Sequence, residues 1–386
     1  MSSIPKIRFK GFTDDWEQRK LDDVVEFLDT MRKPLEGAKR ISGPYPYYGA
    51  SGIVDYVDGY LFDEELILLS EDGANITDRN YPVCFLASGK YWVNNHAHVL
   101  RTKQENENNF ICNSLERKDY TQYNTGMAMP KLNKETCKKI PISCPGFEEQ
   151  KKIGDYFRSL DHLITLHQRK YEQTKTLKKY MLQKMFPQNG EKIPQIRFNG
   201  FTEEWKQRKL GNVFKEYSEK NHTELPVLTI IQRRGTVKRK ESDRNLLYDE
   251  SNLLNYKMVR KDDFIVHLRS FEGGLEKSSL DGIISPAYHT FHSDEADSRF
   301  YYPYFRSHEF IKHKLVPHVY GIRDGRSIDI AGMKTIEIPY TSIEEQKKIG
   351  DYLDSLDYLI TLHQRKYTEL EELKKYMLQN MFPQKG

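Results

Sequence analysis

Glu148–Pro187 reads EEQKKIGDYFRSLDHLITLHQRKYEQTKTLKKYMLQKMFP, and Glu344–Pro383 repeats it with 31 of 40 residues identical. Each copy contains one glycine and has no proline before its last residue, and its apolar residues recur every three or four positions. This spacing predicts a long amphipathic helix close to coiled-coil period, which Pro187 or Pro383 ends. At ~1.5 Å per residue such a helix is about 58 Å long, too long for one helix of a compact domain.

A second repeat lies upstream of the first. Ile4–Val24 returns as Ile193–Val213 with 14 of 21 residues identical, whereas the intervening blocks, about Val25–Phe147 and Phe214–Ile343, show no evident resemblance to each other. One frame kept around two unlike blocks indicates a scaffold that presents two different recognition surfaces. Because each block must return the chain to the opposite end, we expect the two helices to pack against each other in antiparallel fashion.

The repeats predict the domain organisation of the 386 residues. We expect an α+β protein with a pseudo-twofold internal repeat, in which two globular mixed α/β recognition domains are separated by two long antiparallel coiled-coil-like helices. Gln188–Lys192 is the candidate linker between the halves. The expected parts are residues 1–147 (first domain), 148–187 (first helix), 188–343 (second domain) and 344–386 (second helix).

Short apolar runs between turn residues predict strands in both blocks. One segment of the second block, which contains Pro303, is predicted to be helical. The strand candidates are Tyr60–Ser70, Val83–Ala87, Tyr91–Arg101, Phe264–Ser270 and Ala287–His292, and the helix candidate is Tyr302–Leu315.

Composition limits the class of protein. The chain is polar, with a mean hydropathy of −0.75, and its apolar runs fall short of the ~18 residues of a membrane span. The opening MSSIPK does not resemble a signal peptide, so we expect a cytoplasmic protein without membrane contact. The four cysteines form no C-x-x-C pair, which favours reduced thiols over a zinc site.

The charge balance argues against a protein that binds nucleic acid tightly without a partner. The formal net charge is only +4. Ile4–Phe147 has 19 basic and 21 acidic residues, and Ile193–Ile343 has 24 and 21. Because affinity for nucleic acid grows with the number of phosphates neutralised, we expect weak general binding unless cations cluster or a partner supplies them.

Catalytic motifs are missing from the sequence. Asp294–Asp297 spells the helicase tetrapeptide DEAD, but no G-x-x-x-x-G-K-[ST] loop is present to hold a nucleotide. Glu149–Lys151 resembles half of a nuclease motif without the preceding Pro-Asp, and neither an adenine methyltransferase motif nor G-x-G-x-x-G occurs. We expect a protein that is not an enzyme. Two other classes of protein stay open as alternatives. One is a stand-alone nuclease or helicase, and the other is a coiled-coil scaffold that binds no DNA.

The repeated frames carry a family resemblance. The pattern F-x-G-F-x-x-x-W-x-x-x-x-L at Phe9–Leu21 and Phe198–Leu210 resembles the opening of each target-recognition domain in specificity subunits of type I restriction–modification systems. The pattern I-P-x-x-x-P-x-x-x-E-Q-x-x-I at Ile140–Ile153 resembles the same family, although the copy at Ile338–Gln346 lacks the second proline. Segments inside the blocks that also resemble varieties of this domain are Tyr45–Gly52, Glu71–Ala74, Val93–His98 and Ser285–Tyr288.

This resemblance implies a DNA-specificity subunit. Each block would read one half of a split, asymmetric target in double-stranded DNA, and the helices would set the gap between the halves. It also implies two modification subunits that methylate adenine with S-adenosylmethionine, and two restriction subunits that use ATP and Mg²⁺. All of these cofactors would then be bound by the partner subunits and none by this chain.

In the first block, tyrosines beside glycines at Tyr45–Gly52 suit a loop in which ring and backbone approach a phosphate or base. His96 and His98 alternate along an expected strand and would face one side; without a third ligand they are expected to contact DNA or pack rather than bind metal. The candidate DNA-binding residues of this block are Tyr47, Tyr48, Ser51, Asn75, Asn95, His96 and Lys131.

In the second block, five cations fall within eight residues after the apolar run Val227–Ile231. Arginine suits guanine and lysine suits phosphate, so this loop is a candidate DNA contact, with a solvated charged face as the alternative. A second arginine-bearing turn, Gly321–Arg326, has as its companion the turn Thr125–Lys131 of the first block. The candidate DNA-binding residues of the second block are Arg233, Arg234, Lys238, Arg239, Lys240, Tyr288, Arg323 and Arg326.

Apolar positions of the repeated frames and helices are candidates for contacts between the helices and with the partner subunits. These residues are Trp16, Trp205, Leu160, Ile164, Leu356 and Ile360.

Overall fold

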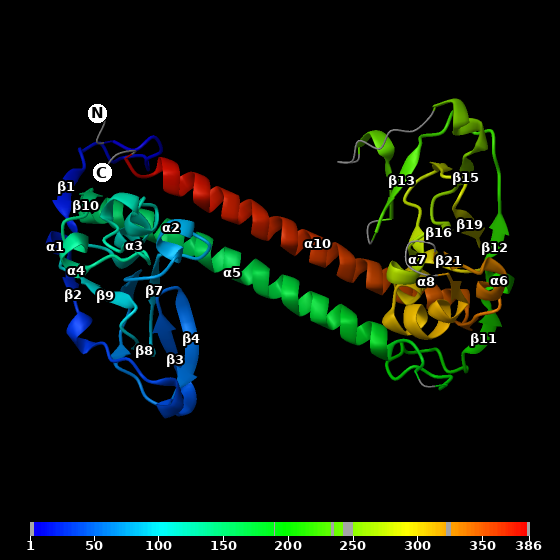
Figure 1. Cartoon of the computed structure of the whole chain (residues 1–386), viewed down its shortest axis with the longest axis horizontal. Helices are drawn as coiled ribbons and strands as arrows, with labels where there is room; N and C mark the ends of the chain where they lie inside the picture. Colours follow the sequence, from blue (N-terminus) through cyan, green and yellow to red (C-terminus); the bar gives the residue numbers. More distant parts are fainter. Residues whose placement is uncertain (1–3, 189, 233–234, 242–249, 322–325, 384–386) are drawn as a thin grey trace. The chain divides into compact units, whose positions relative to one another are not determined.

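Figure 1 presents a computed structural model of the chain, which describes residues 4–188, 190–232, 235–241, 250–321 and 326–383. The chain forms two compact units. Unit 1 combines residues 1–169 with 364–386, and unit 2 comprises residues 170–363. Two long helices, α5 (Phe147–Lys184) and α10 (Ile343–Asn380), are divided between the units, so that each helix has one part in unit 1 and the other part in unit 2.

Unit 1 contains the first block, which is rich in short strands. Its strands are β1 (Glu17–Lys20), β2 (Val25–Phe27), β3 (Ser42–Gly49), β4 (Gly52–Val57), β5 (Phe62–Asp63), β6 (Leu66–Ser70), β7 (Cys84–Ala87), β8 (Lys90–Val93), β9 (Ala97–Thr102) and β10 (Pro141–Cys144). Its short helices are α1 (Leu21–Val24), α2 (Asn75–Asp78), α3 (Asn108–Glu116) and α4 (Lys134–Cys137).

Unit 2 contains the second block. Its described strands are β11 (Lys206–Lys209), β12 (Lys215–Tyr217), β13 (Leu228–Ile231), β14 (Gly235–Lys238), β15 (Lys257–Val259), β16 (Phe264–Val266), β17 (Glu276–Lys277), β18 (Gly282–Ile284), β19 (His289–His292), β20 (Val319–Tyr320), β21 (Ser327–Ile328) and β22 (Glu337–Tyr340). Its described helices are α6 (Leu210–Val213), α7 (Ser270–Gly273), α8 (Ser298–Phe305) and α9 (Ile330–Met333), with a π-helical turn at Glu309–Leu315.

The two long helices confirm the prediction from the repeat. Each has 38 residues and begins one residue before the expected boundary. Within each unit they run antiparallel: Lys374 Nζ of α10 lies 2.5 Å from Asp161 Oδ1 of α5 in unit 1, and Lys178 of α5 pairs with Asp357 of α10 in unit 2. The two ion pairs occupy equivalent positions of the repeat.

The end of α10 completes the core of unit 1. Phe382 is 1% exposed, stacks on Phe110 with ring centroids 5.4 Å apart, and meets Trp16 edge-on at 6.1 Å. In unit 2, Phe186 after the end of α5 occupies the equivalent place and meets Trp205 edge-on at 5.9 Å. Each core therefore depends on a residue that follows a long helix.

The repeated N-terminal frames attach each block to the start of a long helix. Arg8 Nε donates to Glu149 Oε1 at 2.7 Å, and Arg197 Nε donates to Glu345 Oε1 at the same distance. Both carboxylates are almost fully buried, at 2% and 0% exposure. A buried carboxylate has to be paired, so the Glu149–Lys151 motif that resembles a nuclease fragment holds the helix start in place.

The two blocks share one sheet topology although their sequences are unlike. Unit 1 has a four-stranded antiparallel sheet in the order β2-β9-β6-β7, and unit 2 has the order β12-β19-β16-β17. In both units the sheet is followed by a helix, α3 or α8, and then by a strand that pairs with the frame, β10 with β1 or β22 with β11. The pseudo-twofold repeat thus extends into the blocks.

Both faces of the sheet in unit 1 are covered, which explains the continuous apolar run of β6. Ile67 and Leu69 join the cluster that contains Trp16, whereas Leu66 and Leu68 join a cluster with residues of β8. Alternate residues of a strand point to opposite faces. A second sheet of order β4-β3-β8-β5 therefore forms a further layer of unit 1.

Three strand predictions are wrong in extent. Tyr60–Ser70 contains both β5 and β6, because β5 pairs with β8 whereas β6 pairs with β7 and β9, so the chain changes sheets between them. Tyr91–Arg101 likewise contains β8 and β9 with a turn between. Phe264–Ser270 is a strand only as far as Val266. The helical prediction for Tyr302–Leu315 holds for the end of α8 and the π-helical turn. No helix in the described parts of the chain combines the length and apolar content needed to cross a membrane.

Candidate nucleic-acid interface

Loops that are distant in sequence meet beyond the end of β6 in unit 1. Glu71 N–H donates to His96 O at 2.9 Å, and Gly73 N–H donates to Pro130 O at 3.0 Å. Ser70 Oγ donates to Ala50 O at 2.5 Å, which brings the β3–β4 turn to the same place. We call residues 50–51, 71–75, 94–96 and 124–131 loop cluster 1.

Loop cluster 1 contains most candidate residues of the first block. Ser51 and Asn95 are exposed. The His96 side chain is 50% exposed and its Nδ1 lies 2.8 Å from Asp72 Oδ1, while the Lys131 side chain is 49% exposed. The structure thus gathers polar side chains from separate segments of sequence on one surface, as a base-reading or phosphate-binding surface requires.

A buried ionic network supports loop cluster 1 from below. Arg32 Nη1 donates to Glu71 Oε2 and to Ala97 O, both at 2.7 Å. His98 Nδ1 lies 2.8 Å from Asp29 Oδ2. Burial lowers the pKa of His98, but hydrogen bonds and charge from Asp29 and Cys137 outweigh burial and raise the pKa to about 10. The ring is therefore cationic and paired at neutral pH.

The prediction that His96 and His98 face the same side is wrong. His96 lies in the turn before β9 and is exposed, whereas His98 lies within β9 and is 1% exposed. His98 Nε2 also lies 2.7 Å from Leu132 O, so this histidine holds the loops together and does not contact a ligand. Among the described residues, no group of three His, Cys, Asp or Glu side chains could hold a metal ion.

Tyr47 is also a wrong candidate, because it is 1% exposed and its hydroxyl accepts a hydrogen bond from Leu35 N–H at 2.9 Å. Tyr48 is half-buried against Phe85 and Tyr91. The Asn75 side chain is bound to its own loop, where its Oδ1 accepts from Tyr81 N–H at 2.8 Å. Tyr47 is therefore buried, whereas Tyr48 and Asn75 are partly exposed but contact other residues of their own block.

Unit 2 has an equivalent loop cluster. Beyond β16, the ring of His267 meets Tyr288 at 6.1 Å, and the guanidinium of Arg326 lies 4.9 Å from the ring centroid of Phe271. A Cβ added to Gly273 would lie 2.3 Å from Gln232 Nε2, which places Gln232, the residue after β13, here as well. We call residues 232, 267–273, 285–288 and 326 loop cluster 2.

The basic segment of unit 2 is only partly described. Lys238 ends β14 and its Nζ lies 3.3 Å from Glu241 Oε1, while Lys240 is exposed. Arg239 is half-buried, and its backbone N–H donates to Val227 O at 2.9 Å. The candidates Arg233, Arg234 and Arg323 lie outside the described residues.

Sequence reasoning missed exposed residues in both clusters. Leu268 is 60% exposed and Arg269 is exposed just after β16, while Met127 is 105% and Met129 60% exposed in loop cluster 1. Each lies in the loop that follows a central strand or precedes α4. Their places in the topology that the two units share would have marked these residues as candidates. The shared topology could not be recognised beforehand, because the sequences of the two blocks show no evident identity.

The candidate helix residues serve the two cores. Trp16, Trp205, Leu160 and Leu356 are all 5% exposed or less, so they offer no surface to a partner subunit. Ile164 and Ile360 are half-buried. Exposed apolar side chains occur instead at equivalent helix positions: Leu163, Leu373 and Tyr376 in unit 1, which we call helix patch 1, and Leu359, Leu177 and Tyr180 in unit 2, which we call helix patch 2.

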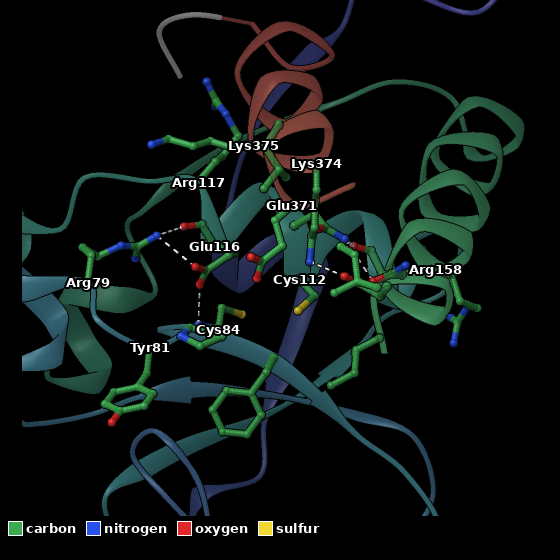
Figure 2. Close-up of a pocket in the computed structure, with 18 of the residues that line it drawn as sticks. Arg79, Tyr81, Cys84, Cys112, Glu116, Arg117, Arg158, Glu371, Lys374 and Lys375 are labelled. Carbon is green, nitrogen blue, oxygen red and sulfur yellow. Dashed lines mark hydrogen bonds and ion pairs between the residues drawn. The ribbon is translucent and has the colours of Figure 1, made fainter. Parts of the chain in front are cut away.

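Figure 2 shows a pocket of about 920 Å³ in unit 1, between α3, β7 and the long helices. Two ion pairs join charged groups of its lining: Arg79 Nη2 lies 3.1 Å from Glu116 Oε1, and Lys374 pairs with Asp161. Burial raises the pKa of the Cys84 thiol, which therefore stays protonated and is a poor nucleophile. Among the described side chains that line the pocket, none is an activated nucleophile paired with a base.

Comparison with known proteins assigns both units to one domain family. The family described as "Type I restriction modification DNA specificity domain" matches residues 13–176 and 202–372. The type I restriction enzyme MjaVIII specificity subunit of Methanocaldococcus jannaschii is 24% identical over 399 residues, which cover 95% of this chain and 91% of that protein.

Two further similarities agree with this assignment. S.HindORF215P of Haemophilus influenzae, provisionally named a type I restriction enzyme specificity subunit, is 37% identical over 150 residues, 39% of this chain and 38% of that protein. The crystal structure of the type I restriction–modification system S subunit from M. genitalium has a TM-score of 0.67 at 15% identity, covering 98% of this chain and 99% of that one. At this identity the structural likeness shows a shared fold.

Proposed function

Because this chain belongs to the type I restriction–modification DNA specificity family, we propose that each of its units reads one half of a bipartite, asymmetric DNA target. The observation that carries the proposal is the repeated sheet with an equivalent loop cluster in each unit. The same four-stranded sheet supports both surfaces, whereas the strands around it and the side chains on the surfaces differ.

The composition of the two clusters supports different half-sites. Loop cluster 1 presents Asn95, His96 and Lys131, whereas loop cluster 2 presents Arg269 and Arg326. Asparagine suits adenine, arginine suits guanine, and lysine binds phosphate without regard to sequence. Unlike surfaces on a pseudo-twofold frame favour an asymmetric target over a palindrome.

The long helices are proposed to set the gap between the half-sites. Each helix contributes residues to both units, and its length grows by ~1.5 Å per residue. Half-sites read from one face of B-DNA repeat about every 34–36 Å, so the number of helical residues would select the number of unread base pairs.

Helix patches 1 and 2 are proposed to bind two modification subunits, one on each unit. Three equivalent positions of the repeat leave apolar side chains exposed in both units, and exposed apolar groups favour a protein partner. The modification subunits would supply S-adenosylmethionine-dependent adenine methylation, and two restriction subunits would supply ATP- and Mg²⁺-dependent cleavage. The chain would act in the cytoplasm, as the non-catalytic subunit.

A block exchange tests the reading of half-sites. Replacing Val25–Phe147 with the corresponding block of another member of the family should change one half of the methylated sequence and leave the other half and the gap unchanged. The matched exchange of Phe214–Ile343 should change only the other half. Methylation mapping of genomic DNA measures both, and a change in both halves from one exchange would contradict independent reading.

A second experiment separates this proposal from an enzyme or a DNA-independent scaffold. The purified chain alone should show no methylation, cleavage or ATP hydrolysis with S-adenosylmethionine, ATP and Mg²⁺, and only weak DNA binding in a gel shift. Adding the modification subunit should produce sequence-specific binding and methylation. Activity of the chain alone, or a complex without sequence-specific binding, would refute the proposal.

A further inference from the structure

The loop before α4 in unit 1 is closed by its own side chains. Asn124 Oδ1 accepts hydrogen bonds from both Gly126 N–H and Lys131 N–H at 2.9 Å. Thr125 N–H donates to Lys131 O at 2.8 Å. A Cβ at Gly126 would lie 1.8 Å from Met129 O, so the tip is wound too tightly for any other residue at that position. We call residues 126–130 the methionine tip.

The methionine tip is also held to the rest of loop cluster 1. Pro130 O accepts from Gly73 N–H at 3.0 Å, and Leu132 N–H donates to Glu71 O at 2.7 Å. The methionine tip is therefore fixed at both ends, and it lies among the other loops of loop cluster 1.

Two apolar side chains project from this tip. Met127 is 105% exposed and Met129 is 60% exposed, while polar or charged side chains, including His96 and Lys131, surround the base of the tip. Isolated exposed apolar residues are common on protein surfaces. A long apolar side chain on a braced tip beside Lys131 is a different case, because apolar side chains of this kind enter base steps of DNA in proteins that kink the duplex.

We propose that Met127 is an apolar wedge that enters the base stack of the half-site read by unit 1. The inference rests on the proposed function. A wedge unstacks one base step, and pyrimidine–purine steps yield most readily. Met127 therefore gives unit 1 a preference for such a step at one position, without a hydrogen bond to any base.

The bracing of the tip makes this insertion efficient. A loop that is ordered before binding loses little conformational entropy when it binds. Removing the wedge should weaken specific binding by about tenfold, since the thioether no longer buries its surface. The salt dependence of binding should stay unchanged, because methionine neutralises no phosphate.

The experiment uses the full chain bound to its modification subunits and duplexes with 2-aminopurine placed at each purine of both half-sites in turn. Fluorescence rises where a base loses its stacking. In the wild-type complex we expect one signal at each methylated adenine and a further signal at one step in the half-site that the Val25–Phe147 exchange alters. Met127→Ala should lose only the further signal, and its base preference at that step should relax. Met127→Leu should keep both the further signal and the base preference.

Leu254→Ala is the matched control, since Leu254 is an exposed apolar residue of unit 2, at 57% exposure. It should leave the further signal unchanged. Thermal unfolding of Met127→Ala should match that of the wild type, because the side chain is fully exposed. The wedge is refuted if specific binding occurs without the further signal, if Met127→Ala retains it, or if this variant instead loses the modification subunits. Absence of specific binding by the wild-type complex would refute the proposed function itself.

Discussion

Truncation of Phe382 tests whether the end of α10 completes unit 1. The ring is 1% exposed and lies 5.4 Å from Phe110 and 6.1 Å from Trp16 between centroids. Phe382→Ala leaves a cavity among aromatic side chains, and such a truncation costs about 3–5 kcal/mol. At about 1.4 kcal/mol per factor of ten, unit 1 should open roughly 100- to 4,000-fold more often.

Hydrogen exchange measured by mass spectrometry resolves this effect by unit. Peptides covering β6, at Leu66–Ser70, should lose protection in Phe382→Ala, while peptides covering β16, at Phe264–Val266, should keep it. Phe186→Ala at the equivalent position of the repeat is the matched variant and should give the opposite pattern. Equal loss of protection in both units, or a change below about 1 kcal/mol in unit 1, would refute the role given to the helix ends.

The remaining predictions concern the spacer, the basic segment and a buried ion pair. Deleting Tyr171–Thr174 together with the equivalent Tyr367–Leu370 shortens each helix by about 6 Å, so methylation mapping should find a shorter gap with both half-sites unchanged; altered half-site bases would contradict the spacer role. Replacing Lys238 and Lys240 with glutamine should reduce the slope of log affinity against log salt by up to about 0.9 for each phosphate that is no longer neutralised, whereas an unchanged slope would mean that these lysines are only solvated. Because the folded pKa of His98 is raised from 6.5 to about 10, its contribution to stability is full below pH ~6.5 and is lost as the pH rises through about 10; His98→Gln should remove this part of the pH dependence of unfolding, and its persistence would contradict the assignment.

The helices were predictable because their signal is local. The 3–4 spacing of Ile153, Phe157 and Leu160 marks the buried face of α5, and the same positions recur in α10. The proline after each copy marks the end. The frames were equally readable, since Arg8 and Arg197 occupy matching places in a repeat that is visible by eye.

The interior of the blocks was much less predictable. Tyr47 belongs to an aromatic, glycine-rich segment that suggests a contact surface, yet its position in β3 turns the ring into the protein. His96 and His98 are two residues apart, and a strand that begins between them separates an exposed ring from a buried one. The error arose because a turn divides the expected strand Tyr91–Arg101 into β8 and β9, so the two rings do not share one face of one strand.

The candidate interface could be predicted in part. Asn95, His96 and Lys131 were singled out from sequence, but their meeting depends on hydrogen bonds between segments as far apart as Gly73 and Pro130. Met127 carried no signal of its own, because an exposed methionine and a buried one look alike in a sequence.

The sequence by itself determined the duplicated frame, the two long helices and the family resemblance, because identity and helical period are properties of neighbouring residues. The tertiary structure decided that both blocks contain the same sheet, that Phe186 and Phe382 close the two cores, and which side chains reach the loop clusters. Strand pairing and core packing join residues that are distant along the chain. Many different apolar sequences satisfy the same pairing, so the common fold of the blocks leaves little trace in their residues.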